Sequence, residues 1–568
     1  MNGQRFQVAS QCCFHSTVPI LILSPRPVIP ALARSTHSRH IASTTAQEGC
    51  AALASAALLC GYACFHTSGL SSRRLHRSQR PARARTRHAI VAATAATTSA
   101  SIEPRSQTDL LSDLVLWLQN LGAFGLDGLS VAQSPLPHRG RVVFAKRDFE
   151  PGEELCKVPA AAILAVPSHG PEDNVGDEAE VSLAKALLNE RHLGARSRLA
   201  PYIASLPAEG ELPLTHPLFW PQDLCLKELF AGSVHGQRVA AEVLKVGEAH
   251  VEALLSSRAA VNESEARWAS AIVETRAFTF QPDTDQEQLA LVPFLDMLNT
   301  FSLLRDGEAL WQCSFEAEGP ASEGASLAVD RPIRQNQEVL HVYNTNSSAM
   351  LWMTYGFIED GDGENPFEVA GLSVNLHEAV ASDDVDVQRA KLAALRAADL
   401  LVQQPLVFEL PSDGELGGTL LPVARLLGCR TAQEVGELAP TIFSVVVDGG
   451  APKNSGLELE VRARRLVAEW LRRALHDSDT AMSKHQNKLV TGIDGKCSKQ
   501  HQHLHELAER LLRRERPVLE LELRACDEFV AEAAKVLQGS SRDAGADSRR
   551  AEFEAEQWDD ETGWLGAG

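Results

Sequence analysis

The sequence predicts an α+β fold in which a strand-rich domain with a helical insert precedes an all-α domain. Short β-type runs bounded by turn residues occur on both sides of a stretch of helical spacing at about 181–280, within residues 106–360. From 361 to 540, long helical patterns dominate. A chain of 568 residues is too long for one core of ordinary size, so at least two domains are expected.

The first domain opens with a helix for which Thr108 is the expected cap. Two β-type runs within 138–166 are separated by the turn residues Glu150, Pro151 and Gly152, which predicts a β-hairpin. In the insert, Asn262 and Glu265 have the spacing of a capping box and predict the start of a helix. Further strands are expected at 289–294, 310–315, 325–329 and 338–343.

The segment IEDGDGENP at 358–366 combines acidic and turn residues and marks the expected domain boundary. It does not fit a calcium loop, because Asn365 stands where such a loop needs glycine and Gly371 where it needs glutamate. At the other end of the helical domain, residues 541–568 are rich in acid, Gly and Ala. We expect them to be disordered.

Residues 1–105 are rich in Ser, Ala, Thr and Arg and poor in acid, which is the composition of an organelle-targeting presequence. We therefore exclude them from the fold and expect a plastid location, the chloroplast stroma, with the mitochondrion as the alternative. The uncharged run at 49–65 is at the short limit for crossing a bilayer, so a cleaved leader and a membrane step during import both stay open. No permanent membrane anchor is expected, because an Arg-rich segment follows the run.

The net charge of −20 is distributed unevenly. Residues 1–100 contain eleven Arg, no Lys and one acid, a contribution of +10, so the remaining residues contribute −30. An acidic body repels nucleic-acid phosphates and favours a basic partner. We therefore expect a protein substrate and no nucleic acid.

The 11 cysteines are scattered and form no CxxC pair, which argues against a zinc site or a disulfide framework and suits a reducing compartment. His501, His503 and His505 form a short run after Cys497. Because no second cluster of ligands accompanies this run, we interpret it as a solvated loop and helix start, and we expect no metal site.

Two motifs point to a specific chemistry: LVPFLDMLNT at 291–300 and EVLHVYNTNSSAMLWMTYGF at 338–357. Together with PLFWP, GQRV and WASAIVETRAF, which precede them, they resemble the SET-domain proteins of the Rubisco large-subunit methyltransferase family. The resemblance covers about residues 111–357. It extends more weakly through the helical domain, which is similar to that family's substrate-binding domain.

The resemblance implies a SET β-clip domain with a pseudoknot. It also implies S-adenosylmethionine as the cofactor, bound between the first hairpin and the two motifs, with the target side chain entering from the opposite face. In this interpretation Tyr343 is the catalytic residue. The cofactor-binding residues that the resemblance implies are Arg139, Gly140, Arg141, Asn299, Thr300 and Phe357. The substrate-binding residues that it implies are Arg276, Asp296 and Tyr355.

Methyl transfer is an in-line displacement, so its rate depends on holding the nucleophile and the methyl group close and collinear. A lysine has a reference pKa near 10.4, so removing its proton at pH 7 to give the neutral amine costs about 4.6 kcal/mol. An apolar tunnel beside a sulfonium lowers the pKa of the amine and therefore lowers that cost. We expect a monomeric S-adenosylmethionine-dependent protein-lysine N-methyltransferase that acts on a folded protein, for which a plastid enzyme is one expectation.

Two alternatives stay open: a protein-histidine N-methyltransferase, and a catalytically inactive SET-fold interaction module. The second is motivated by two departures from the family pattern in the cofactor-site segments: Val142 stands in place of a glycine and Thr300 in place of a histidine. In a third departure, Asn344 stands in place of a glycine.

Overall fold

The fold is described from a computed structural model of the chain. It describes residues 107–134, 140–168, 179–212, 216–221, 224–257, 261–281, 284, 286–305, 308–316, 319–343, 346–359, 361, 363–402, 404–412, 414, 418–442, 456–491 and 499–542. The predicted presequence, Arg139, Asn344 and residues 543–568 of the predicted tail lie outside these ranges. Within these ranges, no helix is long and apolar enough to cross a membrane.

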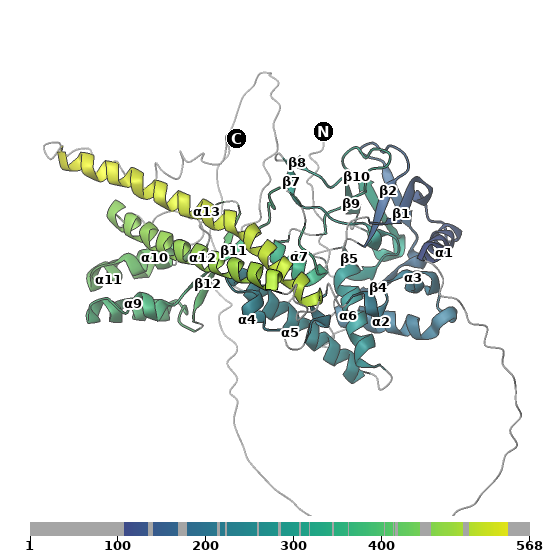
Figure 1. The fold of residues 1–568 in the computed structure, drawn as a ribbon, viewed down its shortest axis with the longest axis horizontal. Helices are drawn as coiled ribbons and strands as arrows, with labels where there is room; N and C mark the ends of the chain where they lie inside the picture. Colours follow the sequence, from purple (N-terminus) through teal and green to yellow (C-terminus); the bar gives the residue numbers. More distant parts are fainter. Residues whose placement is uncertain are drawn as a thin grey trace, which may run out of the picture. The chain divides into compact units, whose positions relative to one another are not determined.

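Helix α1 (Gln107–Asn120) opens the described chain, and small antiparallel sheets follow it (Figure 1). The sheets are ordered β1-β2, β3-β10-β9, β4-β6-β5 and β7-β8. Their strands are β1 (Leu129–Gln133), β2 (Arg141–Ala145), β3 (Glu154–Val158), β4 (Leu164–Pro167), β5 (Ala277–Phe280), β6 (Gln288–Leu291), β7 (Leu304–Arg305), β8 (Glu308–Ala309), β9 (Cys313–Glu316) and β10 (Ala325–Val329).

The hairpin predicted across Glu150 to Gly152 is wrong. A turn does form there, but β2 pairs with β1 and β3 pairs with β10. The reason is competition for the free edge of β2. The backbone N–H of Ala145 donates to the carbonyl of Gln337, and the N–H of Val339 donates to the carbonyl of Val143, so a later segment occupies that edge.

The insert between β4 and β5 is helical: α2 (Ala179–Leu193), α3 (Ala200–Ser205), α4 (Leu226–Leu229), α5 (Val234–Ser257) and α6 (Glu263–Arg276). The capping box at the start of α6 is confirmed. The N–H of Glu265 donates to Asn262 Oδ1 at 3.0 Å, and the N–H of Asn262 donates to Glu265 Oε2 at 3.2 Å. Helix α6 ends at Arg276, and β5 follows without a loop, so the last helix of the insert leads directly into the strand-rich part.

The C-terminal region is helical as predicted, but it is not all-α. Helix α7 (Ser348–Tyr355) still lies within the first predicted domain. The described helices after it are α8 (Leu376–Ala379), α9 (Val385–Ala397), α10 (Leu420–Gly428), α11 (Ala432–Ile442), α12 (Leu457–Thr491) and α13 (Lys499–Arg542). Strands β11 (Val369–Val374) and β12 (Leu406–Pro411) add an antiparallel pair. A Cβ on Gly371 of β11 would lie 2.4 Å from the backbone nitrogen of His235 in α5, so this glycine permits a close approach of strand and helix.

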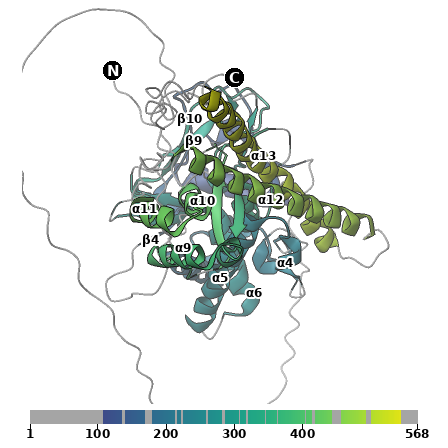
Figure 2. The ribbon, with the colours of Figure 1, turned by 90° about the vertical axis from the view of Figure 1, so that its left-hand side faces the viewer.

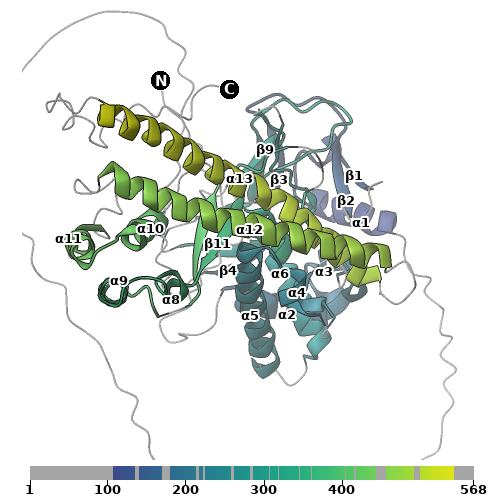
Figure 3. The same ribbon diagram turned by 60° about the vertical axis from the view of Figure 1, so that its left-hand side comes forward.

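The buried apolar residues form separate clusters. One fills the strand-rich part together with α2 and α6, and another fills the C-terminal region. In that region α12 and α13 lie side by side (Figures 1 and 3), and α9, α10 and α11 gather beside α12 (Figure 2). A third cluster joins α5, α7 and α13 through residues that include Val239, Trp352 and Leu507. Helix α13 therefore packs directly against elements of the first predicted domain.

Candidate active site

The β1-β2 hairpin, which was not predicted, enters its second strand at Gly140 and Arg141, two of the residues that the family resemblance assigns to the cofactor. Gly140 has a φ of 63°, in the left-handed region that favours glycine. Arg141 is tied on two sides: its Nη1 donates to the carbonyl of Ser205 at 2.7 Å, and its own carbonyl accepts from Asn299 Nδ2 at 2.9 Å. These bonds join the hairpin to the helical insert and to the first motif.

The two motifs meet beside this hairpin. Asn299 Nδ2 also donates to Glu338 Oε1 at 3.0 Å, and the N–H of His341 donates to the Asn299 carbonyl at 3.1 Å. Residues 338–343 form isolated bridges to separate segments, two of them parallel, where a strand was predicted. The N–H of Tyr343 donates to Thr300 Oγ1 at 3.2 Å, so this threonine ties the two motifs together.

Tyr343 belongs to a row of half-buried aromatic rings. Its hydroxyl donates to the carbonyl of Leu298 at 2.7 Å. The ring centroids of Tyr343 and Tyr355 are 4.8 Å apart, and those of Tyr355 and Phe357 are 6.3 Å apart. All three side chains are partly exposed, so the row offers an apolar wall beside a fixed hydroxyl.

Asp296 and Arg276 form a buried ion pair next to the hairpin. Arg276 Nη1 donates to the carbonyl of Asp296 at 2.8 Å and lies 3.3 Å from its Oδ2, and the Asp296 side chain is fully buried. The guanidinium of Arg141 lies in the same cluster. Burial and repulsion by Arg276 lower the pKa of Arg141, and the Asp296 carboxylate opposes that shift.

Tyr202, in helix α3 of the insert, completes this cluster and was not predicted. Its hydroxyl donates to Asp296 Oδ2 at 2.9 Å. Burial and the adjacent carboxylate raise its pKa well above the usual value, so the hydroxyl stays protonated and keeps donating. No local pattern in the sequence identifies Tyr202, because its partner lies 94 residues away along the chain.

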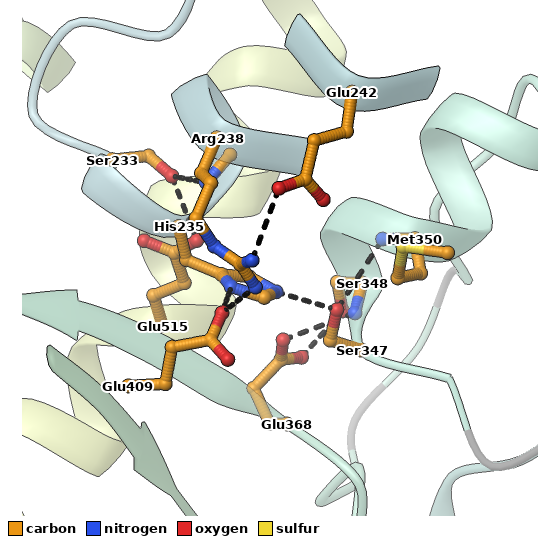
Figure 4. A network of polar contacts seen from close by, with 11 residues as sticks. Ser233, His235, Arg238, Glu242, Ser347, Ser348, Met350, Glu368, Glu409 and Glu515 are labelled. Carbon is orange, nitrogen blue, oxygen red and sulfur yellow. Dashed lines mark hydrogen bonds and ion pairs between the residues drawn. The ribbon is translucent and has the colours of Figure 1, made fainter. Parts of the chain in front are cut away.

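The N-terminus of α7, the helix that ends at Tyr355, is held by a buried polar network (Figure 4). Ser347 Oγ caps the helix by accepting from the N–H of Met350, and it lies 2.9 Å from His235 Nε2. His235 Nδ1 lies 2.8 Å from Glu409 Oε1. This order resembles that of a hydrolytic triad. Ser347 and His235 are both 4% exposed, however, so the trio serves as a support for α7 and not as a nucleophile open to a substrate.

A second buried carboxylate holds the next residue of α7. Both the N–H and the hydroxyl of Ser348 donate to Glu368. Burial raises the pKa of Glu368, and the bonds from Ser348 oppose that rise. The start of the helix is therefore fixed to Glu368, the residue before β11, to strand β12 and to the insert.

His341, which the sequence analysis did not single out, is buried between the rings of Phe278 and Tyr343. Burial lowers its pKa from 6.5 to about 4. Between these values the unfolded chain binds a proton that the folded chain does not, so stability is lost as the pH falls from 6.5 towards 4. The imidazole therefore stays neutral beside Tyr343 at physiological pH.

Replacing His341 with phenylalanine removes this proton linkage. Between pH 7 and pH 5, the free energy of unfolding of the wild type should fall by about 2 kcal/mol more than that of His341→Phe. Urea titrations at pH 7, 6 and 5 measure the difference. Glu359 and Glu368 have raised pKa values, so their protonation makes the folded state more stable as the pH falls. This contribution is the same in both proteins and cancels in the difference. An equal loss in the two proteins would show that His341 is protonated in the folded chain.

The histidine run lies at the start of a helix, as predicted, but it is not a solvated loop. His501, His503 and His505 all lie within α13, and His505 is buried with its Nδ1 3.0 Å from that of His485 in α12. Among the residues with described placement, no group of three or more His, Cys, Asp or Glu side chains is arranged to hold a metal ion.

The structure brings together every predicted site residue that it describes. Gly140 and Arg141 are adjacent, Asn299, Thr300 and Tyr343 are joined by the bonds of the two motifs, and Arg276 and Asp296 share a cluster with Arg141. Tyr355 and Phe357 continue the aromatic row. A hairpin, two motifs in contact and a helical insert are the parts that the family resemblance implies for a SET-type domain. Arg139 lies outside the described residues.

Comparison with known proteins agrees with this class of fold. No family model matches the sequence, and no curated protein sequence matches it. Among solved structures, the chain resembles the SET domain of LSMT bound to lysine and AdoHcy, with a TM-score of 0.52 and 16% identity over 79% of this chain and 98% of that one. The same domain bound to methyl-lysine and AdoHcy gives 0.51 and 17%, over 78% and 97%. The predicted SET fold, of mixed α+β class and LSMT-like, is thereby confirmed.

Proposed function

We propose that this chain is an S-adenosylmethionine-dependent protein-lysine N-methyltransferase that acts on a folded protein. The observation that carries the proposal is the position of Tyr343. Within a SET fold, its half-buried ring lies where the two motifs meet, and it continues into the aromatic row of Tyr355 and Phe357. The similar solved domains are bound to lysine or methyl-lysine and to AdoHcy, which supports the same chemistry here.

The residues present fit the cofactor. Asp296 Oδ1 and Arg276 Nε are buried and have no hydrogen-bond partner among the described residues. One free acceptor and one free donor match the ammonium and the carboxylate of an amino-acid group, which S-adenosylmethionine contains. In this proposal the backbone at Gly140 and Arg141 would hold the cofactor, together with the residues assigned by resemblance: Arg139, Asn299, Thr300 and Phe357.

When bound, S-adenosylmethionine supplies a methyl group made electrophilic by its sulfonium. The task of the protein is to present a neutral amine in line with that carbon. The Tyr343–Tyr355 wall would desolvate the incoming ammonium and so lower its pKa, and Tyr343, fixed by Leu298, would orient the nitrogen lone pair. The resemblance assigns Asp296 and Arg276 to the acceptor channel; because the Asp296 side chain is fully buried, it would act there by holding Arg276 and Tyr202 in position.

The acidic body, at −30 outside residues 1–100, favours a basic protein substrate. A plastid location is part of the proposal and is supported by the composition of residues 1–105. A histidine acceptor is the alternative that shares this geometry, since an imidazole nitrogen also fits an aromatic channel.

Transfer of labelled methyl groups tests the proposal. The chain is incubated with methyl-labelled S-adenosylmethionine and a native plastid extract, and labelled amino acids are identified after acid hydrolysis. We expect methyl-lysine in a protein that loses its label when the extract is heat-unfolded first. Label in methyl-histidine would instead identify the alternative acceptor. An absence of label at every cofactor concentration would favour the inactive interaction module.

A further inference from the structure

Helix α13 contacts the loop that follows α7 through two arginines. Arg514 donates from Nη1 to the carbonyl of Gly363 at 2.7 Å, and from Nη2 to the carbonyls of Glu359 and Gly361 at 3.1 and 2.9 Å. One turn earlier, Arg510 Nη1 donates to the carbonyl of Ile358 at 2.9 Å. One face of α13 therefore donates to four carbonyls within residues 358–363.

The same loop reaches back to the first motif through Glu359. Its two carboxylate oxygens accept from the N–H and the hydroxyl of Ser302, at 2.7 and 2.9 Å. Both residues are buried. Burial raises the pKa of Glu359, while the bonds from Ser302 and the nearby charge of Arg514 oppose the rise.

These contacts fix both sides of the site assigned to the cofactor. Ile358 directly follows Phe357, and Ser302 lies two residues after Thr300. A shift of the loop would therefore move the aromatic ring and the Asn299–Thr300 segment together. Bonds from a charged donor to several carbonyls resist such a shift more strongly than a single neutral bond does.

We infer that Arg514 is a positioning residue of the cofactor site, acting through Glu359 and Ser302, so that α13 completes the site from outside the SET domain. This inference rests on the proposed function, because it assumes that Phe357, Asn299 and Thr300 hold S-adenosylmethionine. It assigns to the C-terminal region a role in cofactor affinity that is separate from substrate docking.

Arg514→Gln in the full-length chain tests the inference, with Arg513→Gln as the matched control. Arg513 is adjacent on α13, but its side chain is 63% exposed and pairs with Glu509 of the same helix. For Arg514→Gln we expect the Kd and the KM for S-adenosylmethionine to rise about tenfold, with kcat at saturating cofactor within about twofold of wild type. Arg513→Gln should match the wild type in all three quantities. A general loss of folded protein would lower kcat per mole of chain and leave KM unchanged.

Ser302→Ala tests the contact between Glu359 and the segment that follows Thr300. This test does not depend on the folding of Arg514→Gln. We expect it to raise the Kd about threefold, and we expect the double variant to bind within about twofold of Arg514→Gln alone, because the two residues act through one loop. Equal Kd values for Arg514→Gln and Arg513→Gln would overturn the inference and leave the proposed function standing. If Arg514→Gln does not fold, an unchanged Kd in Ser302→Ala overturns it. If neither the wild type nor Arg513→Gln binds cofactor, the proposed function fails and the inference fails with it.

Discussion

Tyr343→Phe is expected to slow methyl transfer by about a hundredfold or more while leaving the affinity for S-adenosylmethionine within about twofold. The substitution keeps the ring that lies 4.8 Å from that of Tyr355, so the aromatic wall stays in place. It removes only the hydroxyl, which is fixed by the carbonyl of Leu298. Because orientation of the nucleophile is the main demand of the reaction, the loss should fall on kcat.

Initial rates at saturating cofactor, with the Kd from calorimetry, measure this prediction. Tyr355→Phe is the matched control, because it removes a hydroxyl from the neighbouring ring of the same row. We expect a smaller effect there. Unchanged turnover in Tyr343→Phe would remove the catalytic assignment of Tyr343 but not the SET fold.

Asp296→Ala is expected to lower the free energy of unfolding by about 3 kcal/mol. The carboxylate is fully buried and serves Arg276 and Tyr202 at once, so its removal leaves a buried cation and a buried hydroxyl without their partner. This loss of stability is at the lower end of the range for a broken buried ion pair, because Arg276 keeps its bond to the carbonyl of residue 296 and its side chain is 18% exposed.

Chemical denaturation of both proteins gives the difference. Tyr202→Phe, which removes only the hydroxyl, should cost about 1.5 kcal/mol in the wild type and should stabilise the Asp296→Ala background by about 1 kcal/mol, because there it removes an unsatisfied buried hydroxyl. A cost below about 1 kcal/mol for Asp296→Ala would mean that the pair contributes no net stability, as is known for some buried ion pairs.

Local signals in the sequence predicted those parts of the fold that depend on local interactions. The capping box of Asn262 and Glu265 is confirmed because both partners lie within one helical turn. The turn at Glu150 to Gly152 was also located correctly, but the pairing of its strands was not. The residues that occupy the edge of β2 come from 336–339, almost 200 positions later, and no local turn signal predicts this pairing.

The candidate site shows the same division. Tyr343, Asn299 and Asp296 were selected because they lie in motifs of a known family. Tyr202 lies outside those motifs, and only its hydrogen bond to Asp296 in the folded chain identifies it. The hydrogen bonds from Arg514 to Glu359 and from Ser302 to Glu359 connect residues more than 200 positions apart. In the sequence alone, each of the three is an ordinary polar residue. Hydrophobic periodicity predicts which face of a helix is buried, but it does not predict which distant element that face contacts.

Calorimetric titration of the chain with S-adenosylmethionine tests the central claim most directly. The account predicts saturable binding at one site, with a thermal unfolding midpoint that rises with cofactor concentration, because a ligand that binds only the folded state stabilises it. An absence of both heat and thermal shift at millimolar cofactor would contradict the account. Val142 and Thr300 would then be substitutions that close the site, and the SET fold would serve as an interaction module.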